Sequence, residues 1–288
     1  MRTAVVASSI AAGVRVAAGI ENLPGVDVFI VVCNVGMRPA LLRWARELFL
    51  ALRSFEWRTL TTKVWSYARS GKLIILRRPL NDSASTERLR SLRCDVGLHA
   101  ANVIYREPTI SAFKLGILNA HIGILPKYRG RSVVEWSVLQ GDPIGVTVFF
   151  IDSGIDTGRR IVLREFIPSD RWNDARALKN MLFGCDARLY RKALEGLMRP
   201  GVQFENNDIS KGRRYYVVSK IFTQIVDEIL SVGANRGHAN RSQNGAFGNL
   251  STKVEIDFGQ RKSMLREQTR GNDGTYLHGN SDIPCLHR

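Results

Sequence analysis

Short apolar runs alternate with longer amphipathic segments through the first two hundred residues of the chain. The runs at 3–8 and 26–32 predict buried strands, and the small-residue segment 11–23 between them predicts a helix. Further strands are expected at 72–76, 95–100, 113–121, 145–152 and 159–167. Strands alternating with helices indicate an α/β fold, so we expect a Rossmann-like open sheet of mostly parallel strands flanked by helices.

Apolar residues recur at helical spacing in several of the intervening segments. In 40–55 the apolar stripe includes Leu41 and Leu48, and the arginines of this segment lie on the other side of the expected helix. A short helix is expected at 86–92, and 172–198 predicts one long amphipathic helix that closes the domain. These stripes indicate core packing rather than a ligand site, and they could pack internally or across a homodimer.

The C-terminal part of the sequence offers less material for a core. A short strand is expected within 213–222 and a helix at 223–230, and the chain after Ser231 is rich in Gly, Asn and Ser. We therefore expect a main domain over 1–200, a short irregular extension over 201–232 and a disordered tail over 233–288.

The formal net charge of +16 is unusual, and it is not concentrated in the tail. Residues 38–106 alone hold fourteen basic and five acidic side chains, a net +9. Such a surface favours anionic partners, which include phosphorylated small molecules, RNA and acidic membranes. The charge does not choose among them.

The cysteines point to a reducing compartment. Cys33, Cys94, Cys185 and Cys285 are scattered without metal-ligand spacing, so neither a metal site nor a disulfide framework is expected. The opening residues resemble a secretory signal, but Arg15 interrupts the apolar run. No run reaches the roughly 18 apolar residues of a spanning helix. We expect a cytoplasmic protein with no membrane span.

Two segments carry candidate chemistry. NAHIGILPKYRG, residues 119–130, contains Asn119 and His121, and GVTVFFIDSGIDTG, residues 145–158, contains Asp156. Ligand sites in open α/β sheets lie beyond the carboxyl ends of the strands, where both segments are expected to emerge. If the two segments are neighbours, the three polar side chains are expected to converge at one cleft.

An Asn, a His and an Asp at one cleft suit acyl transfer. The imidazole can accept a proton or help to hold an oxyanion, the amide can donate to that oxyanion, and the carboxylate orients the ring. Because no Cys or Ser is placed to form an acyl-enzyme, direct transfer is the simpler scheme. Singly, each residue has a structural alternative: His121 as a strand-end residue, Asp156 as a turn former, Arg129-Gly130 as a solvated loop and Trp136 as core.

Taken together, the motifs NAHIGILPKYRG, EWSVLQGD, GVTVFFIDSGIDTG and RRIVL resemble the folate-dependent formyltransferase family, closely over residues 95–167. The family includes enzymes that act on methionyl-tRNA, glycinamide ribonucleotide and amino sugars. The resemblance implies N10-formyltetrahydrofolate as formyl donor, a primary amine as acceptor and no metal. It assigns catalysis to Asn119, His121 and Asp156. It also implies cofactor contacts from Leu125, Pro126, Asp152, Gly154 and Ile155 and substrate contacts from Arg129 and Gly130.

The sequence departs from the common family pattern at three places. Ile122-Gly123 stands where many members have Pro-Ser, Phe149 where a His is common, and Arg159-Arg160 replaces a step that usually contains Pro. The first strand also lacks a glycine-rich turn after it. None of these changes removes the trio, but each could alter donor fit or acceptor choice.

The acceptor is inferred by exclusion. Residues 202–288 are poor material for the C-terminal β-barrel with which tRNA-directed members hold tRNA, so methionyl-tRNA is the less expected acceptor. Members that act on glycinamide ribonucleotide usually lack the Arg129-Gly130 step. We therefore expect a small-molecule amine, carried on a nucleotide-linked amino sugar whose phosphates suit a basic cleft. Hydrolysis of formyltetrahydrofolate remains an alternative, as does a non-catalytic relative that binds nucleotide or RNA through 38–106.

Overall fold

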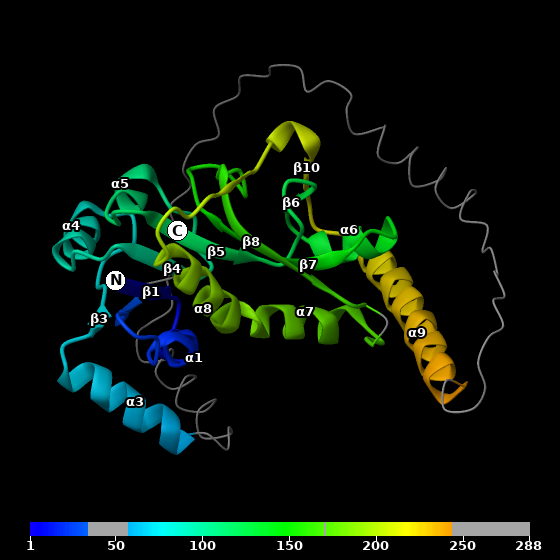
Figure 1. The fold of residues 1–288 in the computed structure, drawn as a ribbon, viewed down its shortest axis with the longest axis horizontal. Coiled ribbons are helices and arrows are strands. Elements are labelled where there is room, and N and C mark those ends of the chain that lie inside the picture. The colour runs from blue at the N-terminus through cyan, green and yellow to red at the C-terminus, as the bar shows by residue number, and fades with distance from the viewer. Residues whose placement is uncertain (34–56, 170, 244–288) are drawn as a thin grey trace, which may run out of the picture. The chain divides into compact units, whose positions relative to one another are not determined.

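A twisted open sheet forms the centre of the computed structural model, which describes residues 1–33, 57–169 and 171–243 (Figure 1). Its eight strands have the order β3-β2-β1-β4-β5-β7-β8-β9. The first five are mutually parallel, as the alternating pattern predicted. They are β1 (Arg2–Ala7), β2 (Asp27–Val32), β3 (Leu73–Ile75), β4 (Val96–Ala100) and β5 (Gly116–His121). The predicted Rossmann-like fold class is confirmed.

The remaining three strands alternate in direction and extend one edge of the sheet. They are β7 (Ile144–Phe150), β8 (Arg160–Ile167) and β9 (Glu205–Asn206). β7 is antiparallel to β5, with Leu118 opposite Phe150 and His121 opposite Thr147. The carboxyl end of β7 therefore lies away from the carboxyl end of β5, so the expectation that both emerge at one edge is wrong.

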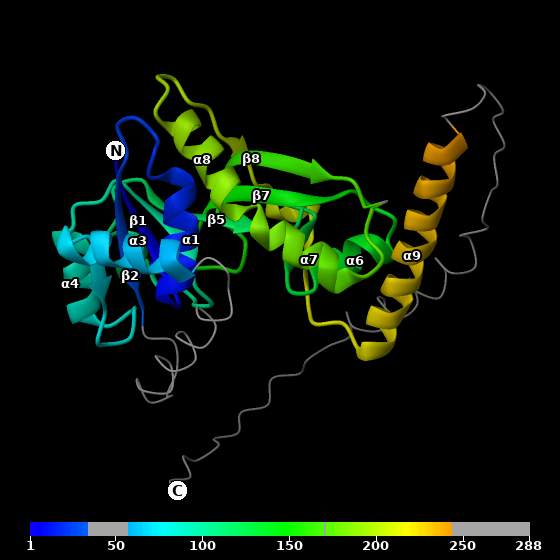
Figure 2. The same cartoon turned by 90° about the horizontal axis from the view of Figure 1, so that it is seen from below.

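Helices cover both faces of the sheet (Figures 1 and 2). Successive strand residues are buried on opposite sides: Val5 and Ala7 join one core cluster, whereas Ala4 and Val6 join the other. Burial on both faces is why these strands are apolar without alternation. The first cluster takes residues from α1 (Ile10–Ile20), α3 (Trp57–Arg69), α7 (Ala175–Gly184) and α8 (Asp186–Leu197), and the second from α4 (Ser83–Ser91) and α5 (Glu107–Ile110).

The helix predicted over 172–198 is two helices. Asp174 caps α7 by accepting a hydrogen bond from the backbone N–H of Ala177, and α7 ends at Gly184. Cys185 separates α7 from α8 but keeps right-handed helical dihedral angles, with φ −77° and ψ −14°. The apolar period therefore continues across the break, which is why the pattern predicted one helix.

The C-terminal segment is integrated with the main domain, unlike the irregular extension expected over 201–232. Residues Met1–Arg241 form one compact unit. A second, two-stranded sheet pairs β6 with β10 in parallel. The sheet consists of β6 (Tyr128–Gly130) and β10 (Arg213–Tyr215). The other elements not yet given are the helices α6 (Val133–Leu139) and α9 (Lys220–Gln243) and the 3₁₀ helix η1 (Ile209–Lys211).

Helix α9 crosses the boundary expected at 232, because it continues to Gln243. The helix predicted at 40–55, the rest of the tail from 244 and Cys285 lie outside the described residues. Within the described ranges, no helix is long and apolar enough to cross a membrane.

The hydroxyl of Tyr190 fills the gap where β4 and β5 separate. Backbone pairing between these strands ends at Leu98 and Leu118. Beyond that point the fully buried Tyr190 hydroxyl accepts a hydrogen bond from Ala120 N at 3.0 Å and donates one to the carbonyl oxygen of His99 at 2.7 Å. One side chain from α8 thus satisfies a main-chain group of each strand beyond the point where their pairing ends.

Replacing Tyr190 with Phe removes both hydrogen bonds but keeps the ring. The Ala120 N–H then loses its partner in a buried place, so we expect the free energy of unfolding to fall by about 2 kcal/mol. Urea denaturation measures this loss. Tyr216→Phe is the matched control, because Tyr216 is 64% exposed, and a change equal to that of the control would contradict the bridging role.

Candidate active site

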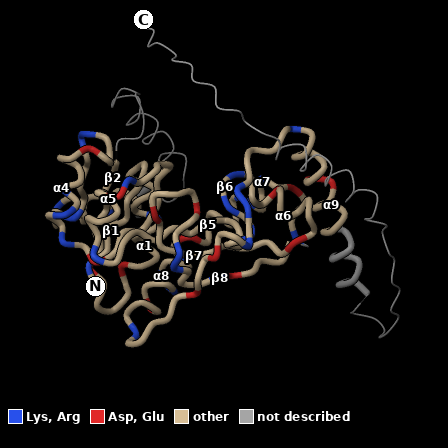
Figure 3. Tube along the Cα trace, turned by 90° about the horizontal axis from the view of Figure 1, so that it is seen from above, with Lys and Arg blue, Asp and Glu red and all other residues tan. Residues whose placement is uncertain are grey.

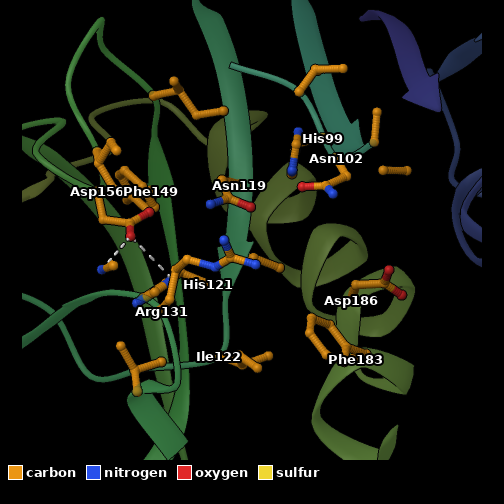
Figure 4. Close-up of a pocket in the computed structure, with 18 of the residues that line it drawn as sticks. His99, Asn102, Asn119, His121, Ile122, Arg131, Phe149, Asp156, Phe183 and Asp186 are labelled. Atoms are coloured by element: carbon orange, nitrogen blue, oxygen red, sulfur yellow. Dashed lines mark hydrogen bonds and ion pairs between the residues drawn. The ribbon is translucent and has the colours of Figure 1, made fainter. Parts of the chain in front are cut away.

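A cavity of about 890 Å³ opens beside the carboxyl ends of β4 and β5 (Figure 4). The loop after β7 and the start of α6 line it on the side of Asp156, and Phe183 of α7 and Asp186 of α8 face it from the other side. Its volume is in the range of cavities that bind cofactors and drug-sized ligands. It is also where ligands bind in open α/β sheets.

Asn119, His121 and Asp156 all line this cavity, so the predicted convergence occurs. Asn119 and His121 lie two residues apart on β5 and therefore point to the same face of the strand. In the part of the chain that the structure describes, the Asn119 amide has no protein hydrogen-bond partner and is free to donate into the cavity. His121 Nδ1 lies 3.6 Å from Asp156 Oδ2.

Strand β6 holds both members of the His121–Asp156 pair. The carbonyl oxygen of Tyr128 lies 2.8 Å from His121 Nε2, and since a carbonyl can only accept, Nε2 carries the hydrogen. Two residues along, the backbone N–H of Gly130 donates to Asp156 Oδ2 at 2.9 Å. With Nε2 occupied by Tyr128, the imidazole presents Nδ1 to the carboxylate.

Asp156 reaches His121 because the loop after β7 doubles back. Inside the loop, the Asp152 carboxylate accepts hydrogen bonds from Gly154 N at 3.0 Å and from the Thr157 hydroxyl at 2.6 Å. Asp156 itself has a left-handed backbone with φ +54°, a conformation that Asp adopts more readily than most residues. Asp156 is therefore a turn residue, as its structural alternative proposed, and the same turn places its carboxylate next to His121.

Thr147 on β7 supports the same region and was not singled out by the sequence analysis. Its buried hydroxyl donates to the Gly123 carbonyl oxygen at 2.7 Å and accepts from Leu125 N at 3.1 Å. It thereby fixes the chain between β5 and β6. The Thr within the GVTV run was the available signal.

The predicted binding residues divide into two groups. Gly130, Asp152, Gly154 and Ile155 line the cavity, whereas Leu125, Pro126 and Arg129 do not. Leu125 is instead buried against Phe149 and Ile161.

Arg129 has a structural role in the described part of the chain, and its substrate contact stays a prediction. Its guanidinium donates to the carbonyl oxygens of Gly212 at 3.1 Å and Ile209 at 3.4 Å. It therefore ties β6 to the segment that leads into β10.

The departures from the family pattern have local explanations. A Cβ at Gly123 would lie 2.7 Å from His121 Nε2, so the glycine leaves room for the ring to reach Tyr128. Phe149 is 1% exposed and belongs to the small apolar cluster with Leu125. Arg160 lies over the Phe150 ring, 4.0 Å from its centroid, and donates to the Leu115 carbonyl oxygen.

Several cavity residues carry chemistry that the sequence analysis missed. Arg131 follows the NAHIGILPKYRG motif, and Arg176 and Lys179 lie one turn apart on α7. Within the described ranges, Arg131 and Arg176 have no ion-pair partner. Their positions next to a motif and on a helix stripe give no sequence signal, because only the fold brings them together. Figure 3 shows Lys and Arg also gathered at α4 and β6.

His99 is a second cavity histidine that the sequence did not reveal. Its Nδ1 lies 3.0 Å from the Tyr105 hydroxyl, and burial lowers the pKa of His99 from 6.5 to about 4. The ring is therefore neutral at physiological pH. It adds a polar group, but no positive charge, beside Asn119.

The family model described as formyl transferase matches residues 61–194, which include Asn119, His121 and Asp156. The fold and the cavity agree with this match, which covers somewhat less than half of the chain.

The proteins that this chain is similar to in sequence or in fold differ in the acceptor that their names give. A methionyl-tRNA formyltransferase from Parabacteroides distasonis is 34% identical over 137 residues, covering 47% of this chain and 42% of that protein. This chain thus spans less than half of that relative's length. A sugar N-formyltransferase from a Shewanella sp. shares the fold with a TM-score of 0.51 at 14% identity, over 81% of this chain and 87% of that one. Glycinamide ribonucleotide transformylase 1 from Symbiobacterium toebii shares the fold with a TM-score of 0.50 at 19% sequence identity, over 72% of this chain and 94% of that one.

The lowered pKa of His99 predicts an acid-sensitive fold. Between pH 6.5 and 4 the unfolded chain binds a proton at His99 that the folded chain does not, so stability falls as pH falls through this window. Relative to pH 7.5, we expect this group to cost about 1–2 kcal/mol at pH 5. Urea unfolding of wild type and His99→Gln at both pH values measures the difference. Equal pH dependence in the two proteins would show that His99 titrates normally.

Proposed function

We propose that this protein transfers a formyl group from N10-formyltetrahydrofolate to a primary amine of an anionic small molecule, for which a nucleotide-linked amino sugar is the best candidate. The observation that carries the proposal is the meeting of Asn119, His121 and Asp156 at one cavity, inside the region that matches the formyl transferase family.

The three side chains suit direct attack of an amine on a formyl carbonyl. As the amine adds, negative charge develops on the carbonyl oxygen, and the free amide of Asn119 can donate to it. The Asp156 carboxylate, 3.6 Å from the ring, stabilises positive charge on His121 next to that oxygen. The proton lost by the attacking nitrogen finally moves to the departing nitrogen of the donor, with the ionisable groups of the cavity as relays.

The donor supplies an activated formyl group, and the cavity has suitable groups to hold it. A planar, hydrogen-bonding ring system needs apolar surface together with main-chain polar groups. Ile155 and Gly154 of the loop after β7 and Val103 and Ile104 after β4 offer both, next to the trio. This loop fits the predicted role of Asp152, Gly154 and Ile155, whereas Leu125 and Pro126 stand outside it.

Two arginines at the cavity, without ion-pair partners among the described residues, favour an anionic acceptor, although the lining as a whole holds as many carboxylates as cations. Arg131 and Arg176 are exposed at the cavity without carboxylate partners in the described part of the chain. Arginine binds phosphate through paired hydrogen bonds, and Lys179 adds a third cation one turn from Arg176. A phosphate-bearing acceptor would satisfy these groups.

Glu135 prepares Lys179 for this role. The carboxylate is buried, with Glu135 2% exposed, and its Oε1 lies 2.5 Å from Lys179 Nζ. An ammonium has three donors, so two remain for a ligand after Glu135 takes one. The buried carboxylate thus fixes a cation at the wall of the cavity.

Methionyl-tRNA is the second candidate acceptor. The curated relative reported above bears that activity in its name, and the basic residues at α4 could contact a phosphate backbone. The two candidates differ in the size of the anion that must bind, so direct comparison of acceptors separates them.

An acceptor panel tests the proposal. Purified protein is incubated with N10-formyltetrahydrofolate and, separately, nucleotide-linked amino sugars, glycinamide ribonucleotide or methionyl-tRNA, and each product is examined by mass spectrometry for one added formyl group. Formate release without acceptor would indicate a hydrolase. Neither turnover nor donor binding, together with salt-sensitive RNA binding, would overturn the enzyme assignment in favour of a binding protein.

Asp156→Asn should lower kcat by about 10²- to 10³-fold while leaving the fold intact. The Asn oxygen can still accept the hydrogen bond from Gly130 N, but it carries no charge for His121. Steady-state kinetics with circular dichroism as a folding check measures both effects. Asp208→Asn, at an exposed turn, is the control. Unchanged turnover in Asp156→Asn would remove this carboxylate from the mechanism.

Arg176→Met and Lys179→Met should each raise KM for an anionic acceptor roughly tenfold with little change in kcat, because they remove binding that is equal in ground and transition states. Lys211→Met provides a surface control that removes the same charge, since Lys211 has a 75% exposed side chain. Initial rates over a range of acceptor concentrations separate KM from kcat. A fall in kcat at unchanged KM would contradict an anion-binding role.

A further inference from the structure

The buried side chain of Asn207 holds the loop that presents Asp156. Its Nδ2 donates to the carbonyl oxygen of Asp156 at 3.2 Å and to that of Gly158 at 3.1 Å. Its backbone N–H donates to the Arg159 carbonyl oxygen at 2.8 Å. One residue therefore bonds three carbonyls within a four-residue stretch that begins at the candidate catalytic carboxylate.

The loop needs support because its conformation is not favoured locally. Asp156 has φ +54°, which costs about 1 kcal/mol or more for a residue with a Cβ. The chain also folds tightly over the end of β7, since a Cβ on Gly158 would lie 1.8 Å from the Phe150 carbonyl oxygen. Such a backbone is stable only when hydrogen bonds from outside the loop hold it in place.

An amide is the right group for this place. The carbonyl oxygens of Asp156 and Gly158 accept only, so both hydrogens of the Asn207 side-chain nitrogen are used, which also fixes its orientation. The other amide atom, Oδ1, is buried without a hydrogen-bond partner among the described residues. Keeping an unsatisfied buried oxygen is costly, and the two loop contacts offset that cost.

We propose that Asn207 is a positioning residue for Asp156, acting through the loop main chain to hold the carboxylate at His121. The proposal rests on the proposed function, because it assigns Asn207 to the same reaction. Asn207 does not line the cavity, and it lies beyond the family match, which ends at residue 194. The C-terminal segment thus contributes to the catalytic arrangement without touching substrate.

The chain offers a matched control in the next residue. Asn206 belongs to β9 and is exposed, whereas Asn207 is 2% exposed. Asn206→Ala removes the same side chain from the same segment without touching the loop. Differences between the two variants report on the contacts to Asp156 and Gly158.

A double-mutant cycle on kcat tests the proposal. We expect Asn207→Ala to lower kcat about ten- to a hundredfold, with little change in KM for the formyl donor or KM for the amine acceptor. Asn206→Ala should leave kcat unchanged. In an Asp156→Asn background, Asn207→Ala should cost less than about threefold, because the group it positions is already altered. Equal kcat in the two alanine variants, or losses that multiply fully in the double variant, would overturn the proposal.

A second measurement does not depend on turnover. Nitrogen chemical shifts of the His121 ring, observed by NMR, should be the same in wild type and Asn206→Ala. In Asn207→Ala they should move in the direction seen for Asp156→Asn. Shifts that stay at wild-type values would overturn the positioning role, even if no acceptor is ever formylated. Should Asn207→Ala fail to fold, Asn207→Ser keeps one donor and is expected to fall between wild type and Asp156→Asn.

Discussion

Two main-chain groups of β6, a strand of three residues, hold the candidate catalytic pair together. The Tyr128 carbonyl takes the Nε2 hydrogen of His121, and the Gly130 N–H binds Asp156. β6 is itself held by β10 and by the guanidinium of Arg129. The chemistry proposed for this protein thus depends on a short strand that lies outside the large sheet.

The reversal of β7 explains why such a clamp is needed. In an all-parallel sheet, residues after neighbouring strands meet at one edge without further support. Here β7 runs antiparallel to β5, so β7 ends beside Leu118. The loop that follows must then return toward His121 at the carboxyl end of β5. Turn bonds within the loop, the contact with β6 and the hydrogen bonds from Asn207 together fix that return.

Local patterns predicted much of this fold and the identity of the trio. The parallel strands were recognisable because burial on both faces makes them continuously apolar. Asn119 and His121 were recognisable only together with the downstream segment GVTVFFIDSGIDTG, since the motifs as a set resemble the formyltransferase family. The break at Cys185 could not be predicted, because the helical period continues through it. The reversal of β7, the role of Arg129 and the cavity positions of His99 and Arg176 depend on strand order and packing, which no local pattern encodes.

Some of the contacts that hold the loop after β7 and strand β6 come from the segment of the chain after residue 194. The match to the family model ends at residue 194, yet Asn207, Gly212 and β10 lie later in the chain and hold the loop after β7 and strand β6. Substitutions in that later segment are therefore expected to change the geometry of the His121–Asp156 pair while both residues stay the same. A comparison of sequences by the motifs around Asn119, His121 and Asp156 alone would miss this dependence.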